Sequence, residues 1–369
     1  MKININLYKL YKLIFPILFI ENDYINNNIL NNIKLIFKKN ILLVKYTNLN
    51  IFLILKLKIK NPYKKKILIS YKKIINILKY IKEDIILSIK NKYLKIKTEY
   101  GLYKINTLKY KYYPYFINFE NNKNKKIIIP KKKILYIIKY LYFIKYKEKN
   151  YMNGIIIKIK KRYIKFYNTN NIILSYIKID KLKYNFKKKY SFYIKKNIFN
   201  IMKNYIKKED KNKNLIIYFN NKYIKFIYNP IELLIKYKKN NLNLNLLLKN
   251  NNKYKNKLTI NKNLFIKSIR RILCNTKKYN IVLNLKKKNI NIENTDNNFY
   301  SKEKIIGFYK GKKKKILIEA KNLIEVFNII DTSSIELYIK NNYNFIFIKN
   351  TFLYKKNINL IILITPLKL

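Results

Sequence analysis

The chain of 369 residues contains no histidine, no tryptophan, one cysteine and four glycines. Without histidine, it can form neither a Ser-His-Asp nucleophile system nor an imidazole metal site. The lone Cys274 excludes an internal disulfide and a zinc site made of several cysteines. Gly101, Gly154, Gly307 and Gly311 are too scattered for a Walker loop or a GxGxxG turn. These absences exclude most nucleotide-dependent catalysis, and we expect no cofactor and no metal.

Acidic residues are also scarce, since 18 Asp and Glu stand against 83 Lys and Arg, a net charge of +65. Glu83-Asp84 and Glu209-Asp210 are the adjacent acidic pairs, and both follow predicted helices. A nucleic-acid enzyme with a carboxylate-bound metal needs clustered acids, so we expect a protein that is not an enzyme. The strong positive field favours a polyanionic partner. Lys, Asn, Ile, Tyr and Phe dominate the composition, as an A+T-rich coding sequence would produce, so part of the charge reflects this bias.

Long uncharged apolar runs are missing as well. The run Leu13–Ile20 follows Lys2 as in a signal peptide, but it contains Pro16 and ends at Glu21 without a small-residue cleavage site. No uncharged stretch approaches the roughly 20 residues that a membrane span needs. We therefore expect no membrane partner and, with a single cysteine, a cytoplasmic location.

The chain carries an internal threefold repeat. A strand-like run followed by an amphipathic helix recurs about every 124 residues, and these helical stripes begin at Ile74, Ile198 and Leu323. A second set of strand-plus-helix units precedes them, with stripes that begin at Leu10, Ile134 and Phe265. With 49% hydrophobic residues, the chain can bury a core, and we expect it to be globular.

The segments between these helices indicate strands. They are rich in Ile, Tyr and Phe, have strand length and are separated by Asn-rich turns. They comprise 41–44, 51–54, 155–157, 163–166, 215–219 and 345–348. Each third therefore predicts an α+β domain, with two helices packed against a β-sheet. The expected domains are 1–122, 123–248 and 249–369.

Lysines recur at matched places in these helices. Lys72, Lys196 and Lys321 each lie two residues before the apolar stripe, and Lys79 matches Lys203. Cations at equivalent places of a threefold repeat suit a symmetric polyanion that the domains surround. The alternative is that these lysines form ordinary solvated helix faces in a lysine-rich chain.

Three stretches resemble the bacterial replicative sliding clamp, the beta subunit of DNA polymerase III. The end of the chain, 363–369, resembles the apolar strand and Met-Pro-Met-Arg-Leu ending of that family. The run 151–154 is similar to its Tyr-Leu-Asn-Gly run, and Thr107-Leu108 with Tyr113-Pro114 is similar to the end of its first domain. The resemblance extends over the whole length, with three domains of the expected spacing.

This resemblance implies a non-catalytic processivity factor for DNA replication. Two three-domain subunits would close head to tail into a dimeric ring, with helices around double-stranded DNA and sheets outside. The partners would be the DNA polymerase III catalytic subunit and a clamp loader. The residues expected at or beside the inner surface are Lys72, Lys79, Lys195, Lys196 and Lys203, to which we add Lys139 and Arg270 from their place on helices.

The resemblance also implies a pocket for partner peptides. Its expected residues are Met152, Thr169, Leu174, Leu248, Leu363, Thr365, Pro366 and Leu367. The segment 169–174 departs from the family pattern Thr-Asp-Gly-His-Arg-Leu, because it lacks Gly, His and Arg. This puts the polar rim of the pocket in doubt, and the segment could instead be a core strand that binds nothing.

For the ring contact, the resemblance implies that Ile272 and Leu273 face Tyr103 of the second subunit. Both could instead be core residues of their helix. The family is commonly acidic outside, so the charge of +65 implies that here the outer face also binds nucleic acid nonspecifically. A basic, ribosome-associated RNA-binding protein is the alternative function. Such a protein has no reason to show the threefold repeat and clamp-like ends.

Overall fold

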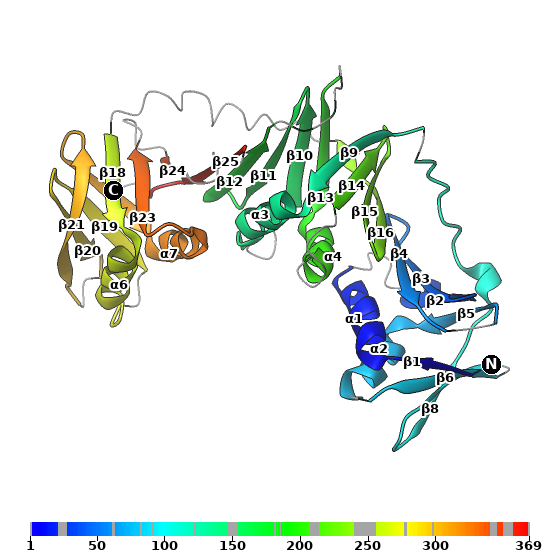
Figure 1. The fold of residues 1–369 in the computed structure, drawn as a ribbon. Coiled ribbons are helices and arrows are strands. Elements are labelled where there is room, and N and C mark those ends of the chain that lie inside the picture. The colour runs from blue at the N-terminus through cyan, green and yellow to red at the C-terminus, as the bar shows by residue number, and fades with distance from the viewer. Residues whose placement is uncertain are drawn as a thin grey trace. The chain divides into compact units, whose positions relative to one another are not determined.

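The computed structural model describes residues 2–367 apart from 21–27, 61–62, 82, 91, 122, 146–153, 181, 183, 185, 187, 207–213, 240–255, 277–278, 297–298, 340–344 and 350–356. The chain forms two compact units. One comprises Met1–Leu135 with Lys195–Lys238, and the other comprises Tyr136–Ile194 with Lys239–Leu369. Figure 1 shows the elements of both.

The first unit contains two antiparallel sheets and most of its helices lie in one layer (Figure 1). The smaller sheet has the order β1-β6-β7-β8, made of β1 (Lys2–Ile5), β6 (Ile85–Lys90), β7 (Tyr93–Lys97) and β8 (Leu102–Asn106). The larger has the order β5-β2-β3-β4-β16-β15-β14-β9, made of β5 (Lys65–Ser70), β2 (Asn32–Lys38), β3 (Ile41–Thr47), β4 (Ile51–Lys58), β16 (Ile231–Lys236), β15 (Tyr223–Tyr228), β14 (Asn214–Phe219) and β9 (Lys125–Pro130). The helices are α1 (Leu7–Ile14), α2 (Tyr71–Tyr80) and α4 (Lys196–Ile206), with 3-10 turns η1 (Phe15–Phe19), η2 (Asn28–Asn31) and η3 (Tyr110–Tyr112).

The second unit is built on one long antiparallel sheet. From β13 onward its order is β13-β10-β11-β12-β25-β24-β23-β18-β21-β20-β19-β22. The strands are β10 (Gly154–Lys160), β11 (Tyr163–Thr169), β12 (Ile173–Ile179), β18 (Asn256–Asn261), β19 (Asn280–Leu285), β20 (Asn289–Asn294), β21 (Lys302–Lys310), β22 (Lys314–Glu319), β23 (Ser334–Ile339), β24 (Ile346–Lys349) and β25 (Ile358–Ile364). The helices are α6 (Lys262–Ile272) and α7 (Ala320–Ile329). Three elements lie at the boundary between the units, namely α3 (Lys131–Tyr142), β13 (Tyr190–Lys195) and β17 (Lys238–Lys239).

The repeat of strand and helix is confirmed at all six predicted places. Each helix follows its strand directly or after one capping residue, in the pairs β1–α1, β5–α2, β9–α3, β13–α4, β18–α6 and β22–α7. Side chains at three junctions cap the helix: Asn6 accepts from the Lys9 N–H, Ser70 from Lys73, and Asn261 from two N–H groups. The six strand-like runs between the helices lie in strands as well, except that Phe345 immediately precedes β24.

The helical stripes differ from the expectation at some ends. The first stripe predicts helix through Ile17, but α1 ends at Ile14 and continues as η1. Pro16 is the reason, because proline has no N–H to donate and its ring clashes with the preceding turn. Ile81 and Ile330 extend their stripes, yet both are C-cap residues with extended backbone.

The helices bury their apolar stripes. In the first unit, η1 contacts α1, α2 and α4, and the Tyr205 hydroxyl on α4 donates to the Leu13 carbonyl of α1. In the second unit, α6 packs on α7, where the rings of Phe265 and Phe327 lie 5.4 Å apart. Each fully buried side chain of this size contributes about 1.5–3 kcal/mol, so these contacts fix the helices against their sheets.

Two strand pairs join the predicted thirds of the chain. In the first unit β4 pairs with β16, from Ile51–Ile235 to Leu55–Ile231. In the second unit β12 pairs with β25, from Ile173–Ile364 to Ile179–Ile358. Half of the middle third thus shares a sheet with the first third and half with the last third. This explains why the contacts divide the chain into two units, whereas the predicted three-domain boundaries stay a prediction.

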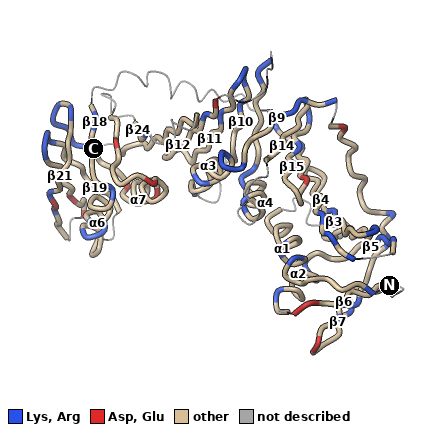
Figure 2. Tube along the Cα trace, in the orientation of Figure 1, with Lys and Arg blue, Asp and Glu red and all other residues tan. Residues whose placement is uncertain are grey.

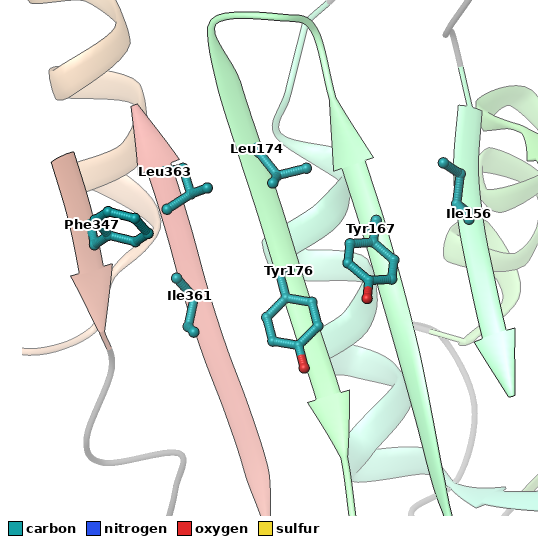
Figure 3. Packing of buried hydrophobic residues seen from close by; sticks show 7 residues of the cluster. All are labelled: Ile156, Tyr167, Leu174, Tyr176, Phe347, Ile361 and Leu363. Carbon is teal, nitrogen blue, oxygen red and sulfur yellow. The ribbon is translucent and has the colours of Figure 1, made fainter. Parts of the chain in front are cut away.

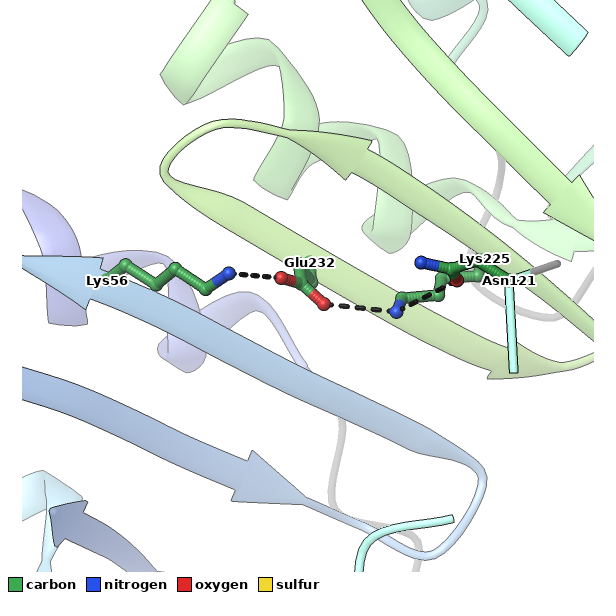
Figure 4. Close-up of polar contacts among 4 residues, drawn as sticks. All are labelled: Lys56, Asn121, Lys225 and Glu232. Atoms are coloured by element: carbon green, nitrogen blue, oxygen red, sulfur yellow. Dashed lines mark hydrogen bonds and ion pairs between the residues drawn. The ribbon is translucent and has the colours of Figure 1, made fainter. Parts of the chain in front are cut away.

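A charged bridge reinforces the first of these joins (Figure 4). Glu232 on β16 binds Lys56 on β4 and, at 3.1 Å, Lys225 on β15. Lys225 also donates to Asn121 at 3.3 Å. Burial alone would raise the pKa of Glu232, but the hydrogen bonds from the two lysines outweigh it and lower the pKa. The carboxylate therefore stays ionised and ties three strands together.

Candidate functional site

The first turns of the helices are uniformly basic. Each of the six α-helices that the structure describes has a lysine in its first turn, and none has an acid there. These lysines are Lys9, Lys72, Lys73, Lys131, Lys132, Lys133, Lys196, Lys262 and Lys321. Acids lie beside two of these turns: Glu319, the N-cap residue of α7, accepts from the Asn322 amide at 2.9 Å, and Asp84 accepts from the Leu7 N–H at the start of α1 at 3.4 Å.

This charge pattern weakens the helices and favours phosphate. The N-terminus of a helix is the positive end of its dipole, so an acid there would stabilise it by about 0.3–1 kcal/mol and a lysine does the opposite. The same N-terminus attracts anions through its unpaired N–H groups. Lysine in the first turn adds to that attraction, which gives each helix a positively charged end.

Five of the predicted DNA-binding residues lie in the first unit. Lys72 and Lys79 are exposed at the two ends of α2. Lys195 ends β13 and is exposed, while Lys196 and Lys203 on α4 are partly exposed. Because η1 contacts both α2 and α4, the structure brings these five into one helical layer (Figures 1 and 2).

The other two predicted DNA-binding residues lie in the second unit. Arg270 is exposed in the last turn of α6. Lys139 on α3 is partly exposed and forms an ion pair with Asp331. Its charge is therefore partly neutralised, which makes Lys139 a weaker phosphate contact than Arg270. The neighbouring Arg271 is held by both oxygens of Glu303, at 2.7 and 2.6 Å.

Two of the predicted pocket residues lie on paired strands of the long sheet. Leu174 on β12 pairs directly with Leu363 on β25, and both are buried. They belong to a buried cluster, shown in Figure 3, that also contains Ile156, Tyr167, Tyr176, Phe347 and Ile361. Tyr193, Tyr338 and Phe345 pack against it. The structure thus brings these two predicted residues together within a buried apolar and aromatic cluster.

The segment 169–174 forms a tight turn between β11 and β12. The Asn170 side chain accepts from the N–H groups of Ile172 and Ile173 at 3.2 and 2.8 Å. Asn171 has φ of 73°, in the left-handed region that asparagine tolerates better than most residues. Asparagine therefore supplies the backbone shape at the place where the resembling family has glycine. The missing His and Arg have no such replacement in the turn.

The other predicted pocket residues are only partly described. Thr169, Thr365 and Pro366 are partly exposed, and the Thr365 N–H donates to the Ile172 carbonyl at 2.9 Å. Leu367 is exposed, and its backbone pairs with Leu317. Met152 and Leu248 lie outside the described residues. The peptide pocket as a whole stays a prediction.

The predicted ring-contact residues differ in exposure. Tyr103 is exposed on β8, the edge strand of the smaller sheet. Ile272 is 1% exposed at the end of α6, and Leu273 is partly exposed. Within this chain Ile272 is thus a core residue of its helix. The interface role of the three stays a prediction.

Two further groups of apolar side chains are exposed. In the first unit Leu102 precedes Tyr103 on β8, and Leu108 follows that strand. In the second unit Ile306 and Phe308 point out of β21, with 84% and 66% of their surface exposed. The alternation in Lys302–Lys310 is the signal that could have located them, because Ile306 and Phe308 share one strand face with Lys304.

Neither a metal site nor a membrane span is found in the described part of the chain. Its His, Cys, Asp and Glu residues nowhere gather in threes that could hold a metal ion. None of its helices is long and apolar enough to span a bilayer.

Comparison with known proteins supports the resemblance. Residues 1–120 match the family model of the DNA polymerase III beta subunit, N-terminal domain. No curated protein matches the chain significantly. The DNA polymerase III beta subunits of Pseudomonas aeruginosa and Thermotoga maritima have TM-scores of 0.84 and 0.86 at 13% and 12% identity. The sliding clamp of Bacillus subtilis has a TM-score of 0.84 at 16% identity.

These similarities extend from end to end. The alignments cover 100% of this chain and 99–100% of the three solved chains. No comparison supports the RNA-binding alternative. Residues 1–120 therefore match the N-terminal domain family of the DNA polymerase III beta subunit, and the whole chain has the fold of the bacterial sliding clamps.

Proposed function

We propose that this protein is a DNA sliding clamp, a non-catalytic processivity factor. Two copies close head to tail into a ring of six domains, three from each chain with the boundaries 1–122, 123–248 and 249–369. The helices face double-stranded DNA in the channel and the sheets form the outer wall. The protein acts where the chromosome is copied, in the cytoplasm.

The observation that carries this proposal is the set of basic helix ends on a clamp fold. All six described α-helices start with lysine and without acid in the first turn. A helix gains no stability from this arrangement, but a phosphate backbone running past several such ends is attracted at each one. The RNA-binding alternative would need no repeated helix ends.

The ring makes weak contacts sufficient. A closed ring holds duplex DNA by topology, so each lysine can bind a phosphate briefly and release it while the ring stays on the DNA. Lysine suits this role, because its ammonium group is a point charge on a flexible stem and reads no base. Lys72, Lys79, Lys195, Lys196, Lys203 and Arg270 would make these contacts, with a smaller part for Lys139.

The exposed apolar groups support ring closure. Leu102, Tyr103 and Leu108 lie on or beside the edge strand β8 of the first unit. Ile306 and Phe308 are exposed on β21 of the second unit, a strand that contacts α6, whose C-cap residue is Leu273. We propose that the first group of one copy packs on the second group of the other. The contact occurs twice in a head-to-tail dimer and covers the edge strand β8 of each copy.

The polymerase would be tethered at the face around Leu174 and Leu363. An apolar peptide of a partner would dock beside Thr169, Thr365, Pro366 and Leu367, with Met152 and Leu248 as further candidates. The tether raises the effective concentration of the DNA polymerase III catalytic subunit at the primer end. A separate clamp loader would open the ring.

Retention on circular DNA tests the proposal. The protein is loaded with a clamp loader on a nicked plasmid, the salt is raised to about 0.5 M, where the Debye length falls to a few Å, and the plasmid is then cut. We expect the protein to stay on the circle and to leave the linear form. Loss from both forms at the same salt would contradict encirclement and favour binding by charge alone.

A variant of the ring contact provides the control. Ile306→Lys with Phe308→Lys places two charges in the proposed interface while both side chains are exposed in the single chain. The variant should fold with an unchanged melting temperature and sediment as a 45.2 kDa monomer. It should bind short DNA but dissociate from the circular plasmid as fast as from the linear plasmid. Unchanged retention would show that the ring contact lies elsewhere.

A further inference from the structure

Two lysine-rich turns meet at one end of β19–β22 in the second unit. Lys286–Lys288 connect β19 to β20, and residues 310–315 run from the end of β21 to the start of β22. Eight of these nine residues are lysine, and the ninth is Gly311. We call the eight lysines the lysine crown. Seven are exposed, and Lys314 is partly exposed.

The strand order brings the two turns together. The strands lie in the order β21-β20-β19-β22, so the connection from β21 to β22 passes the turn between β19 and β20. The Tyr309 N–H donates to the Lys287 carbonyl at 2.9 Å, and Lys314 pairs with Leu285 across β22 and β19. With strands about 4.8 Å apart, the crown spans roughly 14 Å.

Acids of these strands lie toward the opposite end. Glu303 is near the start of β21 and binds Arg271, while Glu293 is near the end of β20 and binds Lys302 at 2.9 Å. Glu319 ends β22, beside α7. Figure 2 shows Lys and Arg gathered at the end of β21 that lies away from α6. The acids of these four strands therefore lie away from the crown, whereas lysines lie at both ends of β21.

The clustering of eight lysines raises the electrostatic energy of the folded chain. Like charges on neighbouring strands repel each other and destabilise a sheet. An extended polyanion would relieve the repulsion, because each phosphate that meets a lysine releases a bound counterion. Flexible ammonium groups spread over roughly 14 Å fit the backbone of a nucleic acid, whose charges repeat along the strand.

Equivalent turns of the repeat are basic too. Lys38 and Lys39 lie in the β2–β3 turn of the first unit, and Lys160 and Lys161 lie in the β10–β11 turn of the second. Strand β11 runs from that turn to Thr169, which belongs to the predicted partner segment. In the middle third, the basic turn and the partner segment thus lie at opposite ends of one strand.

We propose that the lysine crown is a second binding surface for the phosphate backbone of duplex DNA, separate from the helix ends. It binds DNA outside the channel and does not distinguish base sequences. Encirclement of DNA does not require this surface. The inference does not rest on the proposed clamp function, because the crown would bind DNA in a single, open chain.

A matched pair of variants tests the crown. The crown variant carries Lys→Glu at Lys287, Lys288, Lys312 and Lys313. The control variant carries Lys→Glu at four exposed lysines of the first unit: Lys92, Lys97, Lys222 and Lys236. Both have the same net charge, and thermal unfolding checks that both fold. Binding to a fluorescent 20-base-pair linear duplex is measured by anisotropy from 50 to 300 mM salt.

The crown variant should bind the duplex at least tenfold more weakly than the unaltered protein at 50 mM salt. Its slope of log affinity against log salt should fall by about 3–4, whereas the control should lose less than threefold. Equal losses in both variants, or no loss in the crown variant, would overturn the proposal. Binding to phosphatidylglycerol vesicles is measured as well. A crown variant that loses vesicle binding but keeps duplex binding would also overturn the proposal. Retention of the crown variant on circular DNA at high salt reports separately on the clamp function.

Discussion

The helix ends and the sheet face around Leu174 and Leu363 differ in the physical basis of their proposed roles. The helix ends are exposed, polar and repeated, and their contribution depends on the sign of the charge alone. The sheet face is apolar and close-packed, and its residues interlock. A lysine anywhere in a first turn can attract phosphate, whereas a side chain of the cluster must match the shape of its neighbours.

This contrast explains how the fold persists at 12–16% identity to solved clamps. Electrostatic attraction tolerates sequence change as long as a lysine or an arginine remains at the position. A peptide groove depends on particular side chains, and the turn 169–174 retains its backbone shape through Asn171 while its His and Arg are absent. We therefore expect the DNA-binding role to be robust and the peptide preference to be altered.

The largest effect on the free energy of unfolding is expected for a substitution in the sheet face. Leu363→Ala removes a side chain that is 1% exposed and paired with Leu174. Such a cavity costs about 2–5 kcal/mol in the free energy of unfolding, measurable by urea denaturation. Leu367→Ala, at an exposed position, should change it by less than about 0.5 kcal/mol. A loss under about 1 kcal/mol for Leu363→Ala would mean that the cluster yields easily.

A smaller effect is expected at a helix end. Asn261 accepts from the N–H groups of Asn263 and Leu264 at 3.0 and 3.2 Å, and its loss leaves both unpaired. Asn261→Ala should lower the free energy of unfolding by about 1 kcal/mol. Asn263→Ala, in the exposed first turn, is the control and should cost much less. Equal costs would show that the side-chain cap does not stabilise α6.

The charge at a helix end should trade stability against DNA binding. Lys72→Glu places an acid in the first turn of α2 and should raise the free energy of unfolding by about 0.3–1 kcal/mol. It should also weaken DNA binding and lower the salt slope by at least about 1. Lys79→Glu, in the last turn, should weaken DNA binding similarly but lower stability. The expected signature is that the two variants change stability in opposite directions and lose a similar amount of affinity for DNA.

That signature can fail in one informative way. If both variants bind duplex DNA as tightly as the unaltered protein, the lysines of α2 do not face DNA. The contrast between helix ends and sheet face would then lose its functional meaning.

The last expected effect is a pH dependence on the sheet face. Burial and the charges of Lys160, Lys178 and Lys158 lower the pKa of Lys165 to about 8, against the opposing charge of Asp180. Lys158 and Lys178 pair with Lys165 from the neighbouring strands, and the rings of Tyr163 and Tyr176 lie beside it. Above pH 8 the unfolded chain binds more protons at this lysine than the folded chain, so stability should rise between pH 8 and 9.5.

Lys165→Met should flatten that rise, and Lys161→Met, at an exposed turn residue, should leave it unchanged. Urea denaturation at pH 7.5 and 9.5 measures both differences. A rise of the same size in Lys165→Met would assign the pH dependence to other groups.

Much of the fold follows from residue patterns. The apolar stripes from Ile74 and Phe265 locate α2 and α6, because few structures other than an α-helix place residues spaced with a period of 3.6 on one face. The pairing of strands from different thirds could not be predicted. The residues of Ile231–Lys236 and Ile358–Ile364 do not specify which strand of another third lies beside them. Strand pairing over such distances is set by the packed sheet as a whole.

The candidate site was less predictable. Lys72 and Lys79 were found because helix periodicity and the repeat both mark them. Arg271 and Lys139 show the limit, since only the structure reveals their acidic partners Glu303 and Asp331. Ile272 looks like an interface residue by resemblance alone, while its burial depends on the packing of α6.

The central claim is that helix ends, rather than sheets, face the encircled DNA. A photocrosslinking side chain at position 72, 79 or 196 is compared with one at position 92, 97 or 236 after loading on nicked circular DNA and a wash at about 0.5 M salt. The account predicts strong crosslinks to DNA from the helix positions and weak ones from the sheet positions. Equal crosslinking from both sets, or crosslinks from the sheets alone, would contradict it.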